Sequence, residues 1–152
     1  LAVGQVNCLD NTANNFYITG VQLEVGTAAS DFEFLPVDVN LQRCLRYYEL
    51  LASGDNQVLF DAFYYTATEI RHVVHPKVSM RANPTLDQTS GTDYYRFIRD
   101  AANDKFEDFS LDISTPTAVE FFNSTDMSGT QGESGWVRTD VSSSFIALDA
   151  EL

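Results

Sequence analysis

The sequence has few basic residues. Its 152 residues include 9 Lys and Arg against 22 Asp and Glu, which gives a formal net charge of −13 at pH 7. Binding to nucleic acid requires a basic face that displaces counterions from the phosphates, and docking on an anionic membrane surface requires similar charge. The composition therefore disfavours both kinds of partner.

Cysteine and histidine are also scarce. Cys8 and Cys44 lie far apart, without the close spacing of a zinc site or the dense, even set of a disulfide framework. We expect both to be buried thiols that act as small hydrophobic side chains. On a strand, a spacing of three would place the side chains of His72 and His75 on opposite faces, so no shared metal site is predicted.

Long apolar runs and catalytic motifs are missing as well. No run approaches the roughly 20 apolar residues that span a bilayer, so no membrane insertion is expected. The glycine-rich stretches lack the order of a nucleotide loop, and neither GxSxG nor HExxH occurs. Carboxylates gather at residues 31–38 and 100–108, which indicates a solvated surface, with a calcium site as the alternative. We predict no catalytic residue, no metal ligand and no cofactor.

The residues that are present favour a mainly β fold. The chain is 44% hydrophobic and 12% aromatic, enough for a real core. Short alternating segments recur at intervals of about 8–12 residues between Gly, Ser, Asn and Thr turns, which predicts an antiparallel sandwich or jelly roll. The expected strands are residues 57–65, 69–74, 77–81, 84–86, 94–98, 106–113, 118–122, 135–141 and 145–152, and residues 99–105 are expected to be a loop.

Two segments precede these strands. Residues 15–25 alternate with a period of two and predict another strand. Residues 37–51 change to a helical period. Their apolar stripe, at i, i+3, i+4 and i+7, consists of Leu41, Cys44, Leu45 and Tyr48.

These segments predict three parts. Residues 1–35 are interpreted as the last strands of an upstream β, jelly-roll-like domain, residues 36–52 as a helical neck, and residues 53–152 as a terminal β-sandwich. The chain starts at Leu1, with neither Met nor the layout of a signal peptide, so we expect it to be part of a longer protein.

Adjacent aromatic residues recur through the β region. Neighbours on a strand face opposite sides, so one of each pair must leave its own core. Tyr and Trp can stack on sugar faces while offering a polar tip, although core packing is their commoner use. The candidate ligand-binding residues are Tyr64, Tyr94, Tyr95 and Trp136.

Two stretches near the start resemble a known family. Residues 18–33, ITGVQLEVGTAASDFE, lead to residues 41–49, LQRCLRYYE. Together they resemble the C-terminal region of tail-fibre and related receptor-binding proteins of tailed bacteriophages. In that family a similar strand closes a carbohydrate-binding-module-like jelly roll, and a helix and a terminal β domain follow. Residues 78–86, VSMRANPTL, and the ending LDAEL at 148–152 are similar to later motifs of the family.

The resemblance implies an exposed, extracellular protein of the virion tail fibre that is a homotrimer. Its partners would be other tail proteins and a bacterial surface polysaccharide or glycan. Leu41, Leu45 and Tyr48 would then face the trimer axis or the following sandwich. The alternative is a virion assembly or trimerisation module without a receptor site of its own. An enzymatic depolymerase, motivated only by the carboxylates, is a third reading.

The net charge also bears on the ligand. A charge of −13 repels acidic polysaccharide unless divalent cations intervene. The sequence therefore predicts that the ligand consists of neutral sugars, or of acidic sugars bridged by cations.

Overall fold

The computed structural model describes residues 17–28, 30–100 and 102–151. The chain divides into two compact units, residues 1–36 and residues 37–152. Within the described ranges, every helix is too short or too polar to cross a membrane.

The second unit begins with a helix and continues, in its described residues, as ten strands. The helix α1 spans Val37–Leu45, and none of its residues is buried. The strands are β1 (Tyr48–Ser53), β2 (Val58–Thr66), β3 (Glu69–Val74), β4 (Thr85–Gln88), β5 (Tyr95–Arg99), β6 (Ala102–Phe106), β7 (Ser110–Ser114), β8 (Val119–Asn123), β9 (Ser134–Thr139) and β10 (Phe145–Asp149).

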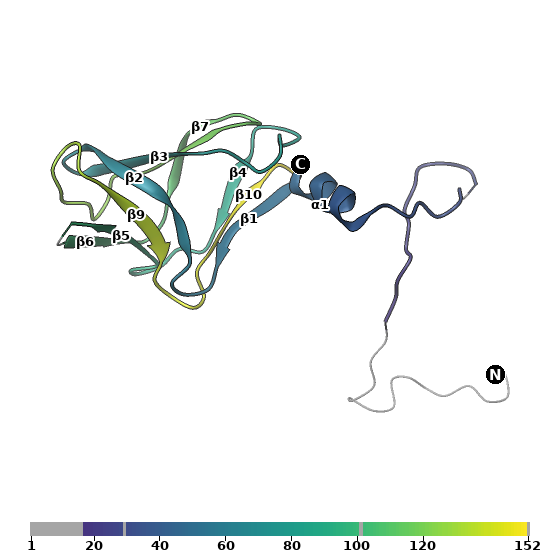
Figure 1. Cartoon of the computed structure of the whole chain (residues 1–152), viewed down its shortest axis with the longest axis horizontal. Coiled ribbons are helices and arrows are strands. Elements are labelled where there is room, and N and C mark those ends of the chain that lie inside the picture. Colours follow the sequence, from purple (N-terminus) through teal and green to yellow (C-terminus); the bar gives the residue numbers. More distant parts are fainter. Residues whose placement is uncertain (1–16, 29, 101, 152) are drawn as a thin grey trace, which may run out of the picture. The chain divides into compact units, whose positions relative to one another are not determined.

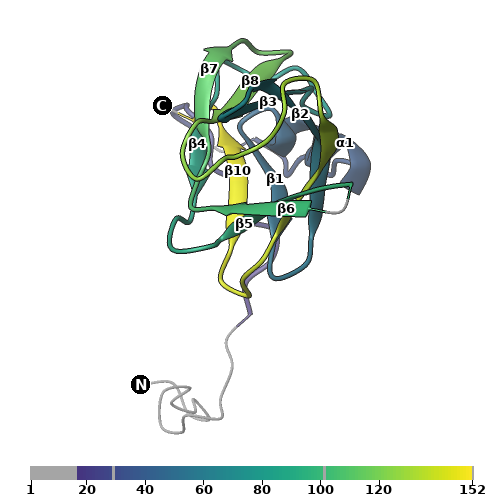
Figure 2. The ribbon, with the colours of Figure 1, turned by 90° about the vertical axis from the view of Figure 1, so that its left-hand side faces the viewer.

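The strands form two antiparallel sheets in a sandwich-like arrangement. The small sheet has the order β1-β10-β4, and the large sheet has the order β6-β5-β9-β2-β3-β8-β7. Figure 1 shows β1, β10 and β4 side by side, with α1 next to the start of β1, and Figure 2 shows the same three strands, again in this order, after a turn of 90°. The expectation of a mainly β, antiparallel sandwich is confirmed.

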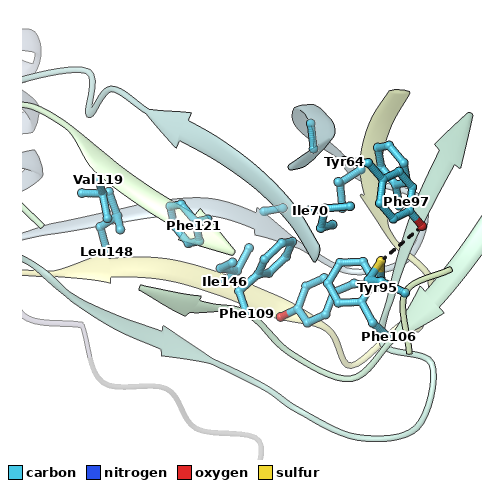
Figure 3. Packing of buried hydrophobic residues seen from close by; sticks show 14 of the residues in the cluster. Tyr64, Ile70, Tyr95, Phe97, Phe106, Phe109, Val119, Phe121, Ile146 and Leu148 are labelled. Atoms are coloured by element: carbon cyan, nitrogen blue, oxygen red, sulfur yellow. Dashed lines mark hydrogen bonds between the residues drawn. The ribbon is translucent and has the colours of Figure 1, made fainter. Parts of the chain in front are cut away.

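Aromatic rings dominate the core. Phe109, which lies between β6 and β7, is 4% exposed and makes edge-to-face contacts with Tyr95, Phe106 and Phe121. The centroid distances to these rings are 5.1, 4.8 and 5.7 Å, and the cluster is visible in Figure 3. Each such pair contributes about 0.5–1.5 kcal/mol beyond its burial. A residue outside the strands thus ties together rings from β5, β6 and β8.

The helix is shorter than its period predicted. It ends at Leu45, and the chain turns so that the Tyr47 N–H donates to the Cys44 carbonyl oxygen at 2.9 Å. Residues 48–53 are the strand β1, which pairs with β10 at the far end of the chain. The prediction of a helix beyond Leu45 is wrong, because this long-range pairing overrides the local period. Cys44 is exposed rather than buried, and Cys8 lies outside the described residues.

Three predictions in the β region are also wrong. Residues 106–113, expected as one strand, are divided between the end of β6 and β7, with residues 107–109 in the connection. Residues 77–81, expected as a strand, form an irregular connection after Pro76, which has no N–H for a ladder. Residues 99–105, expected as a loop, include most of β6, which pairs with β5. β6 is an edge strand with only Phe106 buried, so its polar sequence lacks the apolar alternation of an inner strand.

The described part of the first unit, residues 17–28 and 30–36, contains neither helix nor strand. Val21, Leu23 and Val25 are at least 74% exposed. The strand predicted over residues 15–25 is therefore wrong over its described part. Its period is that of a strand, but no described strand pairs with it. The strands expected further upstream lie outside the described residues.

Candidate functional site

The outer side of the large sheet exposes aromatic rings. On β2, Tyr64 points inward and is 1% exposed, whereas its neighbours Phe63 and Tyr65 are 45% and 51% exposed. On β9, Val137 is fully buried while Trp136 is 36% exposed. The prediction that adjacent aromatic residues divide between the two faces of a strand is confirmed on β2. We call Phe63, Tyr65 and Trp136 the aromatic face.

The strand register brings the aromatic face together. Trp136 is directly opposite Asp61 on β2 and Ile98 on β5, and Ser134 is opposite Phe63. Trp136 and Phe63 are thus diagonal neighbours on paired strands, a relation that places side chains about 7–8 Å apart. Asp61, whose side chain is exposed, is directly opposite Trp136 and lies two residues before Phe63, on the same side of β2. An indole ring therefore has a hydrogen-bond acceptor as its direct neighbour.

Arg71 on β3 holds the adjoining part of this surface in place. Its guanidinium lies 4.7 Å from the Tyr65 ring centroid and 5.7 Å from that of Phe122. It also donates to the carboxylates of Glu120, Glu69 and Asp112, at 2.9, 2.5 and 2.6 Å. These hydrogen bonds, led by the one to Glu120, raise the pKa of Arg71 above its usual value. Because its charge is already paired, Arg71 fixes the rings rather than offering a free cation.

Two of the four predicted ligand-binding residues are in the core instead. Tyr64 is buried, and its hydroxyl donates to Asp104, so burial and this hydrogen bond raise its pKa. Tyr95 is fully buried, with its hydroxyl 3.0 Å from the carbonyl oxygens of Thr89 and Phe145. A ring enclosed by protein cannot stack on a sugar, so the assignment of Tyr64 and Tyr95 to ligand contact is wrong.

The other two predicted residues are accessible but do not lie together. Tyr94 is partly buried in the loop before β5, where its hydroxyl accepts a hydrogen bond from Ser143 at 3.1 Å. Of the four predicted residues, Trp136 is the one that belongs to the aromatic face. Sequence reasoning missed Phe63 and Tyr65 as the outward residues of β2. Asp61 was the available signal, because a carboxylate on one face of a strand marks that face as the solvent side.

The predicted interface stripe is divided between two elements. Leu41 is 57% exposed on α1, and Leu45 is partly exposed at its end. Tyr48 belongs to β1, where its hydroxyl donates to Asp87 at 3.1 Å. Placing Tyr48 on one helical stripe with the leucines is therefore wrong, because the helix ends three residues earlier. Leu41 and Leu45 remain the candidate interface residues of α1.

The two histidines line one cleft, contrary to the prediction. β3 ends at Val74, so His75 leaves the strand and lines the same cleft of about 280 Å³ as His72, Glu49 and Lys77. Burial lowers the pKa of His72, against the opposing charge of Asp61. Its lining residues are engaged with one another: His72 stacks on Phe60 at 4.3 Å, and the buried Glu49 carboxylate accepts from the Lys77 N–H at 2.9 Å. In the described residues, no three His, Cys, Asp or Glu side chains gather as metal ligands.

The fold and this surface define a β-sandwich whose larger sheet exposes an aromatic face. No family model matches the chain, and neither a curated protein nor a solved structure is significantly similar to it.

Proposed function

We propose that the protein is a non-enzymatic attachment module of a phage tail fibre, located on the virion, that binds glycan on the bacterial surface. The aromatic face carries the proposal, because three partly exposed rings lie on one open sheet surface. The resemblance of residues 18–33 and 41–49 to tail-fibre proteins supports the same role.

The chemistry of the aromatic face suits a sugar chain. Trp136 offers a flat apolar surface for a pyranose ring, and the Tyr65 ring and hydroxyl offer a second contact with a polar tip. The adjacent Asp61 carboxylate can accept hydrogen bonds from sugar hydroxyls. Arg71 keeps the Tyr65 ring in position, so little conformational entropy is lost on binding.

Replacement of the indole ring tests the proposal. Trp136→Ala is expected to weaken binding to an array of bacterial surface glycans, and adsorption to host cells, by about tenfold or more, because a few aromatic anchors, Trp above all, dominate binding energy. The matched control is Tyr47→Ala, since Tyr47 is 44% exposed but lies before β1, away from the aromatic face. Unchanged binding by Trp136→Ala, or no glycan binding by the intact protein, would contradict the proposal.

A structural assembly role is the second candidate. It is favoured by α1, in which no residue is buried although Val37, Val39 and Leu41 are apolar. Three copies of the chain could cover these side chains around an axis, as helices do in oligomer necks. In this role the protein would join subunits and other tail proteins without contacting the host.

A further inference from the structure

Three basic residues lie directly beside one another on the outer side of the large sheet. Lys105 on β6 is opposite Arg96 on β5, and Arg96 is opposite Arg138 on β9. We call these three residues the basic row. Like charges in directly opposed positions destabilise a sheet. In a chain with only 9 Lys and Arg, one third of them occupy this row.

One carboxylate, Asp140, serves all three cations. Its Oδ2 accepts from Arg96 at 2.6 Å and lies 3.0 Å from the Lys105 Nζ, while its Oδ1 lies 3.6 Å from Arg138. Asp93, which is half exposed, adds a contact of 3.4 Å to Lys105. Three positive charges thus face two carboxylates, of which Asp140 contacts all three cations and Asp93 contacts Lys105 alone.

The hydrogen-bonding capacity of the two arginines is largely unused. A guanidinium has five N–H donors. Arg96 uses one of them on Asp140, and the Arg138 side chain donates no hydrogen bond to the residues described. The buried Nε atoms of both arginines have no partner there either. The side chains of Arg96 and Arg138 are each 24% exposed and that of Lys105 is 36% exposed, so a ligand can approach.

The basic row borders the aromatic face. Arg138 and Trp136 are two residues apart on β9, so both point to the same outer side. Ile98, directly opposite Trp136, is likewise two residues from Arg96 on β5. Two residues of strand span about 7 Å, so the long arginine side chains can reach back toward a carboxylate carried by a sugar ring stacked on Trp136.

We propose that the basic row binds the carboxylate of an acidic sugar whose ring stacks on Trp136. The inference deepens the proposed function and rests on it. Arginine recognises carboxylates through paired N–H donors, which the sugar carboxylate would find on Arg96 and Arg138. The overall charge of −13 does not prevent this, because charges more than about 8 Å away are largely screened at physiological ionic strength. The expectation of neutral or cation-bridged sugars is revised accordingly.

Calorimetric titration with two matched probes tests the proposal. The probes are tetragalacturonate and its fully methyl-esterified form, which share the same sugar backbone and differ in whether each carboxyl group is charged or carries a methyl ester. The intact protein is expected to bind the acid about tenfold more tightly than the ester, as charged hydrogen bonds are the stronger ones. Raising NaCl from about 50 to about 500 mM should remove this difference through screening.

Variants then assign the preference to the basic row. Arg96→Gln with Arg138→Gln should weaken binding of the acid about tenfold and leave the ester unchanged. Arg46→Gln with Arg81→Gln removes the same net charge outside the large sheet and should leave both affinities unchanged. If the first pair fails to fold, the comparison of acid and ester on the intact protein still decides the question.

Equal affinity for acid and ester would overturn the inference, leaving the basic row as an ionic cluster around Asp140. Glycan binding through the aromatic face would then still stand. Failure of both probes to bind would also overturn it, whereas the proposed function is decided separately by the array and the Trp136→Ala variant. Loss of acid binding in the Arg46/Arg81 control would overturn the assignment to the row.

Discussion

At the scale of single residues, position on the strand decides what an aromatic side chain does. Tyr64 and Tyr65 are chemically identical neighbours, but Tyr64 is enclosed and Tyr65 is 51% exposed. The enclosed ring lies under the Arg99 guanidinium, 4.9 Å from its centroid, and Arg99 pairs with Asp104 at 3.1 Å. Tyr64 is thus part of the core, and the glycan contact that we propose is assigned to its outward neighbours.

Phe109 gives the test of core packing at this scale. Phe109→Ala is expected to lower the free energy of unfolding by about 3–5 kcal/mol, because it removes a buried ring and leaves a cavity among three others. Urea unfolding followed by circular dichroism measures the change. The control is Phe63→Ala, at a residue that is 45% exposed and should cost much less. Similar losses for both variants would contradict the assignment of Phe109 to the core.

At the scale of elements, the boundary between α1 and β1 shows how pairing competes with local period. Residues 41–48 carry a helical pattern, but β10 binds residues 48–53 in a ladder that runs from Tyr48↔Asp149 to Ser53↔Phe145. Glu49 of β1 is buried, and its carboxylate accepts a hydrogen bond from the Lys77 N–H. The helix is left with its apolar residues exposed.

The exposed side of α1 leads to a prediction about assembly. If copies of the chain cover Leu41, light scattering should give three times the mass of one chain, and Leu41→Glu should reduce this to one. The reason is that a charge in an apolar interface loses its hydration without a partner. Ile113→Glu is the matched control, since Ile113 is 58% exposed on β7. A wild-type protein with the mass of a single chain would contradict the trimer.

At the scale of the whole molecule, the distribution of charge matters more than its sum. The net charge is −13, yet Lys105, Arg96 and Arg138 form a local excess of positive charge around Asp140. Burial acts to raise the pKa of Asp140, but hydrogen bonds from Lys105 and Arg96 outweigh it, and the pKa lies below the usual 3.8.

This lowered pKa predicts a pH-dependent contribution to stability. The contribution of the Asp140 carboxylate is present above its ordinary pKa and is lost as the pH falls through the lowered, folded value. Asp140→Asn should therefore have a lower free energy of unfolding than the wild type at pH 7. This difference in free energy should become smaller below about pH 4. Urea unfolding across this range measures it. Asp55→Asn, at an exposed loop residue, is the control. If the stability difference between Asp140→Asn and the wild type stays constant with pH, the Asp140 carboxylate does not make this contribution.

Much of the fold was predictable from the alternation of apolar residues. The strands expected at residues 57–65, 69–74 and 118–122 coincide with β2, β3 and β8 to within one residue, because each has an apolar side that must be buried. The edge strand β6 was missed, since a largely exposed strand has no such pattern. Of the candidate site, Trp136 was predicted and is exposed, whereas Tyr64 and Tyr95 were assigned to the wrong side of their strands.

The mainly β sandwich follows from the alternation of apolar residues, because a period of two along the chain is a local property. The folded chain alone shows where α1 ends, which side of β2 faces the solvent, and that Lys105, Arg96 and Arg138 are neighbours. These features depend on the register between strands that are remote in sequence. Register is set by the packing of the whole core, so no local pattern contains it.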